Sequence, residues 1–551
     1  MLSSRASGIL LHPTSLPSRF GIGELGSAAR QFVDFLAKSK QQFWQVLPLG
    51  PTGYGNSPYM CYSAIAGNPL LISLEVLHDQ KLLSDQQLAN YPDFNQDQVE
   101  FDRVILTQYP LYRHAWDRFQ EISLKTQPDL QAAEEYYQRE LRDYNDQQAK
   151  LSTKSESSAP PIVIDNPLTL PVAPVIHSWL AFQEFCNSKA HWLDDYALFM
   201  ALKQFHDGKC WTEWELDIAW RNPEAIETWS RKLQPEIQFQ KYLQYEFFNQ
   251  WSALKQYAND RHVQIIGDIP IYVAHDSADV WGNPKNFQID DKTGAVAQMA
   301  GVPPDYFSET GQLWGNPVYN WDYLQKTDFA WWIQRFEAML ELVDWIRVDH
   351  FRGFEAYWSV PHGEETAMNG TWVNAPGDAF FKMLKDKMGS LPILAEDLGV
   401  ITPDVEALRD RYDFPGMKVL HFAFGSDPGN VFLPFNYPRN CLVYTGTHDN
   451  DTTVGWFEKL GDWERDNVTA SIGHVSPMGI HWDLMRTALN SVANLSIFPL
   501  QDVFGLGTDA RMNFPGVAEG NWAWRYRSEA IWTDWICDRL GHLTERSGRS
   551  I

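Results

Sequence analysis

Eight short apolar runs recur along the chain, and each one ends in a cluster of polar or charged residues. Amphipathic stretches with helical spacing, such as residues 28–39 and 404–412, lie between most of these runs. The runs begin at Gly8, Phe43, Gln264, Trp345, Leu391, Lys418, Cys441 and Leu495. Eight alternating strand and helix units predict an α/β fold, a closed (β/α)8 TIM barrel.

The polar clusters indicate where function lies in such a barrel. Active sites of these barrels form at the C-terminal ends of the strands, so the residues just after each run are the candidates. A doubly wound open sheet is the alternative fold. That fold usually carries a glycine-rich phosphate loop after its first strand, and no G-x-G-x-x-G follows the run at Gly8. The pattern therefore favours the barrel.

The chain is longer than a barrel needs, which is about 250 residues, so we expect a single catalytic barrel over residues 1–551 with large insertions. We predict a largely helical insertion at 75–260, between the second and third strands, with its Ser- and Pro-rich segment 152–174 as an exposed linker or arm. A Gly-, Pro- and Trp-rich insertion at 274–342 predicts a lid over the barrel mouth. Only about 45 residues follow the eighth run, too few for a C-terminal β-sandwich domain.

Charge and composition narrow the class of partner. The net charge of −25 repels phosphate backbones and anionic membranes, which argues against nucleic-acid and membrane partners. The 24 Trp residues supply flat faces that suit sugar rings as well as a protein core. Five scattered cysteines without a close pair, and no long apolar leader before Pro13, predict a cytoplasmic protein with reduced thiols. We expect a monomer or a weak homo-oligomer.

Carboxylates follow three of the predicted strands. Asp349 comes after the fourth run, Glu396 and Asp397 after the fifth, and Asp449 and Asp451 after the seventh. Cleavage of a glycosidic bond with retention needs one carboxylate as nucleophile and one carboxylic acid to protonate the leaving oxygen. A third carboxylate can hold the substrate. The set therefore favours chemistry at an acetal carbon.

Each of these carboxylates also has a structural interpretation. Arg347 and Asp349 share a strand face, so the arginine favours the ionised form that a nucleophile needs, but such a pair can simply fix a strand end. Glu396 would need a raised pKa to act as an acid, and Asp397 beside it could cap a turn. The segment 447–450 could be an ordinary polar turn. Three such groups at the ends of strands in one barrel favour catalysis.

Several motifs together resemble one family. The catalytic segments are RVDHFRG at 347–353, AEDLG at 395–399 and YTGTHDND at 444–451. The flanking segments are GILLHPTSLPS from Gly8, LPLGPTGYGNSPY from Leu47, WLDDYALFMALK from Trp192, GDIPIYVAHDSADVW from Gly267, GVPPDYFSETGQLWGNP from Gly301, ARMNFPG from Ala510 and NWAWR from Asn521. The chain resembles the 4-α-glucanotransferases called amylomaltases or disproportionating enzymes, glycoside hydrolase family 77, which are relatives of the α-amylases. Amylases share only the three carboxylates, so the flanking segments select the transferase.

The resemblance implies a role for each carboxylate. It implies Asp349 as the nucleophile, Glu396 as the general acid and base, and Asp449 as the group that grips the sugar hydroxyls in the transition state. Arg347 and His448 would assist them. The expected activity is transfer of α-1,4-glucan segments between maltooligosaccharides or glucans, or to glucose, through a covalent glycosyl-enzyme. This chemistry requires no cofactor and no metal.

The same resemblance predicts further substrate-binding residues along the glucan path, with the Trp314 loop as a lid. These residues are Tyr54, Tyr59, Asp268, Gln312, Trp314, Asn316 and Asn513. For Tyr54 and Trp314, ordinary loop packing is an equally good interpretation, since aromatic residues are common in this chain.

Two other functions compete with glucan transfer. An α-amylase-type hydrolase would use the same carboxylates and give the intermediate to water. A glycan-binding protein without activity would lack one of the carboxylates, and all are present. His421, where a glutamine is commoner in the family, and the long segment 152–174 depart from the family pattern. The sequence leaves open whether maltose use or glycogen or starch turnover is served.

Overall fold

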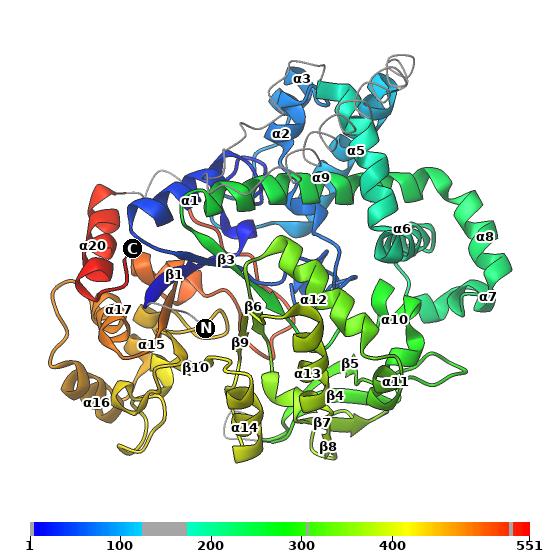
Figure 1. Ribbon diagram of the computed structural model, residues 1–551. Helices are drawn as coiled ribbons and strands as arrows, with labels where there is room; N and C mark the ends of the chain where they lie inside the picture. The colour runs from blue at the N-terminus through cyan, green and yellow to red at the C-terminus, as the bar shows by residue number, and fades with distance from the viewer. Residues whose placement is uncertain (1–4, 124–173, 305–307, 528–532, 551) are drawn as a thin grey trace, which may run out of the picture.

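The centre of the molecule is a closed barrel of eight parallel strands, each of which begins within two residues of a predicted run or inside it (Figure 1). The computed structural model describes residues 5–123, 174–304, 308–527 and 533–550. In barrel order the strands are β1 (Ala6–Leu10), β12 (Leu495–Pro499), β11 (Cys441–Tyr444), β10 (Gly416–Val419), β9 (Ile393–Ala395), β6 (Trp345–Val348), β3 (Gln264–Ile269) and β2 (Phe43–Gln45). The predicted (β/α)8 barrel is confirmed.

Helices surround the barrel and bury their apolar stripes against it. In the first of them, Ala29, Phe32, Val33 and Leu36 are buried at the three- and four-residue spacing of a helix face. The helices around the barrel are α1 (Ser27–Lys38), α12 (Ala330–Leu342), α13 (Gly377–Met388), α14 (Pro403–Arg411), α15 (Thr453–Lys459), α16 (Asp462–Ile472), α17 (Ile480–Asn490), α18 (Leu500–Phe504) and α20 (Asp534–Arg546).

Helices also fill the described part of the chain between β2 and β3. They are α2 (Leu74–Asp79), α3 (Asp85–Ala89), residues 101–123, α5 (Pro174–Ser188), α6 (Ala190–Phe205), α7 (Leu216–Ala219), α8 (Pro223–Lys232) and α9 (Gln234–Asn259). The long α9 contacts β3 and α1 as well as α5 and α6, so it joins the outer helices to the barrel (Figure 1). The predicted arm at 152–174 lies outside the described residues except for Pro174.

A small antiparallel sheet stands beside the barrel mouth. Its strand order is β5 (Gln312–Pro317), β4 (Gln298–Val302), β7 (Ala356–Pro361) and β8 (Thr371–Asn374). The first two strands belong to the segment between β3 and β6, which also holds α10 (Ala278–Gly282) and α11 (Trp321–Lys326), and the other two follow β6. The segment expected to be a lid loop is therefore built around sheet strands. The boundaries 75–260 and 274–342 stay a prediction.

Arg549 closes the barrel at the end of the chain. Its buried guanidinium donates hydrogen bonds to the carbonyl oxygens of Ala6, Leu489, Ser491, Ala493 and Asn494, at 2.7–3.4 Å. These carbonyls flank β1 and β12, which pair with each other. One side chain thereby donates to five carbonyl oxygens, two of which, those of Leu489 and Ser491, also accept hydrogen bonds from Arg5.

Replacing Arg549 with alanine should lower the free energy of unfolding by roughly 2 to 4 kcal/mol, because the five hydrogen bonds of one buried guanidinium are lost at once. Urea denaturation followed by circular dichroism measures the change. Arg546→Ala, three residues earlier and exposed, is the control and should leave the midpoint nearly unchanged. Equal midpoints for the two variants would show that Arg549 does not stabilise the barrel.

Candidate active site

Arg347 lies at the centre of the carboxylate cluster. It stands on β6 opposite Asp268 on β3, and its Nη1 lies 2.9 and 2.7 Å from the two carboxylate oxygens of Asp268. The same nitrogen lies 2.9 Å from Oδ1 of Asp349, at the end of β6. The side chains of Arg347 and Asp268 are 5% and 0% exposed, and that of Asp349 is 28% exposed. One buried cation thus holds two carboxylates, and only Asp349 faces solvent.

The surroundings of Asp268 strengthen this arrangement. The hydroxyl of Tyr59 donates to Asp268 Oδ2 at 2.9 Å. Burial raises the pKa of Asp268 to about 7, and Arg347 opposes the rise. Burial disfavours the charge of Arg347, yet Asp268 and Asp349 raise the pKa of its guanidinium above the ordinary value. Arg347 therefore stays protonated.

Glu396 follows β9 and meets the turn that carries Asp349. Its Oε2 accepts the backbone N–H of His350 at 2.6 Å, and its Oε1 accepts that of Leu398 at 2.8 Å. His350 adopts a left-handed conformation with φ 52°, which non-glycine residues adopt mainly where surrounding contacts fix it. Burial, and then the charge of Asp349, raise the pKa of Glu396 to about 7. Glu396 therefore has the raised pKa that it needs to act as an acid.

Asp397, the next residue, has a structural role. Its Oδ1 accepts the backbone N–H of Met417 on β10 at 2.6 Å, and its Oδ2 pairs with Arg409 of α14 at 2.5 Å. These contacts join the end of β9 to the next strand and helix. Of the two acidic residues after the fifth run, Glu396 therefore belongs to the cluster and Asp397 supports the barrel.

Asp449 completes the set from the loop after β11. Its Oδ1 accepts a hydrogen bond from Asn513 Nδ2 at 2.6 Å, and Nε2 of His448 lies 3.3 Å from its Oδ2. Arg511 donates to the backbone oxygen of Asp449 at 2.6 Å. The side chain of Asp449 is 46% exposed, so it is held in place and remains open to a ligand.

His448 lies in a stack of aromatic rings. Its ring is nearly parallel to that of Tyr59, with centroids 5.1 Å apart and an interplanar angle of 16°, and Trp522 lies 5.9 Å away. Burial lowers the pKa of His448, so the imidazole is neutral at pH 7. Tyr59 thereby touches both Asp268 and His448 and links the two halves of the site.

A single buried carboxylate fastens both ends of the loop that carries Asp449. Asp502 on α18 accepts the hydroxyls of Thr445 and Thr453 at 2.5 and 2.7 Å, and the backbone N–H of Thr453 at 2.7 Å. His421 reaches the same Thr453 hydroxyl at 3.0 Å. His421, which the sequence analysis singled out, thus joins this network.

The sequence alone did not single out Asp502 or Arg511. Asp502 lies three residues after the end of β12, within the polar cluster that follows an apolar run, which is the signal that was available. Its partners are threonines some fifty positions away, so the pairing itself has no local sequence pattern. Asp451, which the pattern did mark, pairs with Lys459 at 2.5 Å and accepts the hydroxyl of Thr508 at 2.9 Å.

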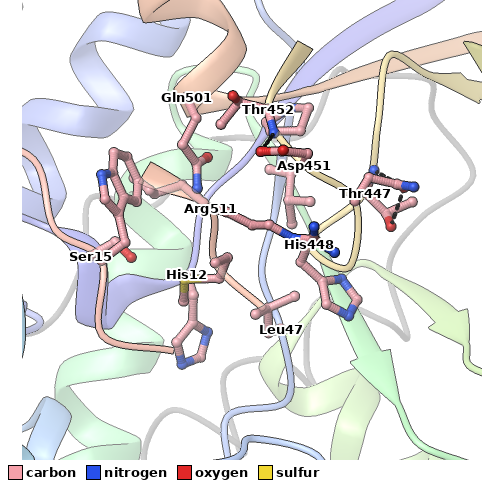
Figure 2. Close-up of a pocket in the computed structure, with 15 residues that line it drawn as sticks. His12, Ser15, Leu47, Thr447, His448, Asp451, Thr452, Gln501 and Arg511 are labelled. Carbon is pink, nitrogen blue, oxygen red and sulfur yellow. Dashed lines mark hydrogen bonds between the residues drawn. The ribbon is translucent and has the colours of Figure 1, made fainter. Parts of the chain in front are cut away.

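A cavity of about 30 Å³ lies behind His448. In Figure 2 the side chains of His12, His448 and Arg511 approach it from three separate segments, and Ser15 and Asp451 also line it. Burial lowers the pKa of His12 to about 3, so its ring is neutral. The volume admits about two water molecules, far less than the pockets that take drug-sized ligands. The open side of the carboxylate cluster is therefore the better candidate for a binding surface.

The residues predicted to line the glucan path take different positions. Trp314 on β5 meets the ring of His350 edge to face, with centroids 4.9 Å apart, and its Nε1 donates to Gln312 Oε1 at 3.2 Å. Asn316 is buried and donates to the carbonyl of Val273 at 2.8 Å, which ties β5 to the end of the loop after β3. Tyr54 is 76% exposed on the turn Tyr54–Asn56. Trp314 thus lies next to the carboxylate cluster.

Within the described residues, no three His, Cys, Asp or Glu side chains are grouped so as to hold a metal ion. The cluster balances its charges with Arg347 instead. A site without metal or cofactor stays a prediction.

Comparison with known proteins decides the family. The sequence model described as 4-alpha-glucanotransferase matches residues 11–157 and 176–530. The chain belongs to the 4-α-glucanotransferase family. It is 52% identical to a 4-alpha-glucanotransferase of Synechocystis sp., over 100% of this chain and 99% of the relative. A 4-alpha-glucanotransferase of Thermus thermophilus is 44% identical over 95% of this chain and 94% of its own.

A solved structure agrees with these sequence matches. An amylomaltase from Streptococcus agalactiae in complex with acarbose matches with a TM-score of 0.87 and 35% identity, over 99% of this chain and 100% of that chain. The predicted family, the barrel and the enzyme class of this 4-α-glucanotransferase family member are confirmed. Of the three functions considered from the sequence, glucan transfer is confirmed, and the hydrolase and the inactive glycan-binding protein are not.

Asp502→Asn should lower kcat for transfer by about 10²-fold, because an amide can accept at only one of the two oxygen positions, so that its NH2 group faces either the threonine hydroxyls or the N–H of Thr453, and Asp449 moves with its loop. Steady-state rates on maltotriose and melting temperatures of both proteins measure the effect. Asp483→Asn is the control, since Asp483 is equally buried and accepts the backbone N–H of Ser476 outside the site. If the two variants lost stability and activity alike, Asp502 would have no particular role in placing Asp449.

Proposed function

We propose that the enzyme transfers α-1,4-glucan segments by retaining double displacement, with Asp349 as the nucleophile. Arg347, 2.9 Å away, pairs with the carboxylate and holds it at the open side of the cluster. Attack of Asp349 on the anomeric carbon forms the glycosyl-enzyme and breaks the bond to the leaving glucan oxygen. Arg347 holds the other carboxylate, Asp268, inside the barrel wall, so that only one nucleophile faces the substrate.

Glu396 supplies and recovers the proton in this proposal. Protonated, it gives its proton to the leaving glycosidic oxygen as Asp349 bonds to the sugar. Ionised after that step, it takes the proton of the acceptor 4-hydroxyl, which attacks the same carbon and releases Asp349. The observation that carries the proposal is the contrast between these two carboxyls. One is paired with an arginine, and the other is half-buried beside it with a raised pKa and, among the residues that the structure describes, no ion pair of its own.

Asp449 and its neighbours bind the sugar at the reacting centre. The exposed carboxylate accepts sugar hydroxyls, while Asn513 and His448 fix its orientation. Trp314, against His350, offers an aromatic face for a glucan and keeps water from the intermediate, which gives the strand β5 the role of the predicted lid. Tyr59 and Asp268 hold Arg347 and the cluster in position from inside the barrel. We retain Tyr54 and Gln312 as contacts of the glucan farther from the reacting centre.

The partners and location follow the same proposal. The substrates are α-1,4-glucans and maltooligosaccharides, and the protein acts in the cytoplasm as a monomer or weak homo-oligomer. Its five cysteines are free thiols, as expected in a reducing compartment. Of the helices that the structure describes, none has the length and apolarity needed to cross a bilayer.

Asp349→Asn should abolish transfer while leaving the fold intact, because the amide keeps the shape and removes the nucleophile. Wild-type protein incubated with maltotriose should release glucose and form longer chains, and the variant should do neither. Chromatography of the products and a melting curve measure both points. A variant that kept more than about a hundredth of the wild-type rate would place the nucleophile elsewhere.

The raised pKa of Glu396 predicts the basic limb of the pH profile. Glu396 must be protonated to act as an acid, so kcat/KM on maltotriose should fall as the pH rises through about 7. A maltosyl fluoride donor, whose leaving group needs no proton, should lose the basic limb of kcat/KM. A basic limb that persisted with the fluoride would assign it to another group.

A further inference from the structure

Trp372 is an exposed aromatic residue at the edge of the small sheet. It lies on β8, where all residues from Thr371 to Asn374 are exposed, and 40% of its own surface is accessible. Its ring contacts Trp358 of β7 at 5.2 Å between centroids, and Trp358 Nε1 donates to the carbonyl of Ala367 at 2.8 Å. The preceding loop is therefore fixed, and the indole is held in one position.

Arg352 connects Trp372 to the catalytic turn. The guanidinium carbon lies 3.8 Å from the centroid of the indole and covers one face of it, so the accessible area of Trp372 falls outside that face. Arg352 is itself buried, three residues after Asp349, and donates to the carbonyl of Val400 in the loop that follows Glu396. The indole thus lies over the residue that joins the two loops carrying the catalytic carboxyls.

The sheet places Trp372 and Trp314 on its two opposite edge strands. Trp314 contacts His350, and Trp372 contacts Arg352, so the short segment after Asp349 lies against both indoles. The hairpins that carry them are joined by the hydrogen bond from Ala367 N to the carbonyl of Thr310 at 3.1 Å. Two aromatic faces on opposite edges cannot stack on the same sugar ring.

We propose that Trp372 is a stacking platform for a glucan unit some distance along the chain from the bond that is cut, on the other side of Asp349 from Trp314. The inference deepens the proposed function and rests on it. A glucan is the occupant because the platform is continuous, through Arg352, with the site that takes the reacting sugars. A rigid indole with one face already supported by a cation offers the other to the apolar face of a sugar at little entropic cost.

The platform predicts binding that depends on chain length. In an Asp349→Asn background, which prevents turnover, Trp372→Ala should weaken the Kd for maltoheptaose roughly three- to tenfold. The Kd for maltotriose should change by a smaller factor, because a short chain bound at the reacting centre makes less use of a remote platform. Isothermal titration calorimetry measures both constants. Trp372→Phe, which keeps an aromatic face, should recover most of the loss.

Trp535→Ala is a matched control. Trp535 is 49% exposed on α20 and meets Trp482 edge to face at 5.8 Å, so it shares the packing of Trp372 and lies outside the site. An unchanged maltoheptaose Kd in Trp372→Ala would overturn the platform. An equal loss of affinity for both sugars would also overturn it, because it would show that Trp372 only supports Arg352. A shift in elution volume with an unchanged Kd would assign the edge strand to self-association instead. Failure of wild-type transfer on maltotriose would count against the proposed function, independently of these binding constants.

Discussion

The ion pair between Arg347 and Asp268 is the constraint on which the site depends. The two residues face each other across the β3–β6 register, and the pair is almost completely buried. A lone buried charge at either position would cost several kcal/mol, so each residue requires the other. Since Arg347 also reaches Asp349, the barrel wall fixes the position of the carboxylate that faces solvent. Rigid strands therefore determine geometry that a loop would hold less precisely.

The loops at the barrel mouth are fixed by a few buried polar contacts. Glu396 accepts the backbone N–H of His350, which requires the left-handed turn directly after Asp349 and brings the ends of β6 and β9 together. Asp502 fastens the ends of the neighbouring loop through two threonines, and Asp449 lies between them. Each contact satisfies a buried donor or acceptor, so the contacts that stabilise the mouth also position the reacting groups.

The sequence predicted the repeated strand and helix units, but it did not predict the pairing of segments that are far apart in the chain. The eight apolar runs became the eight barrel strands because parallel strands buried on both faces read as continuous apolar segments. The small sheet was not predicted, because its strands are short, partly exposed and contributed by two separate segments. Every residue of β8, including Trp372, is exposed. The pattern could not separate Glu396 from Asp397, because adjacent residues at a strand end point to different sides and only the fold shows which side is the site.

Charge balance explains why the cluster suits an oxocarbenium-like transition state. Arg347 brings one positive charge to three carboxyls, Asp268, Asp349 and Glu396, so a fully ionised cluster would carry two excess negative charges in a mostly buried site. Burial raises the pKa of both Asp268 and Glu396 to about 7, and Asp268 also accepts hydrogen bonds from Arg347 and Tyr59. The proposed mechanism requires the proton of the cluster to lie on Glu396. One negative charge then remains unbalanced. It is unfavourable in the free enzyme and becomes favourable as positive charge develops at the anomeric carbon, so the electrostatic stabilisation is greatest in the transition state.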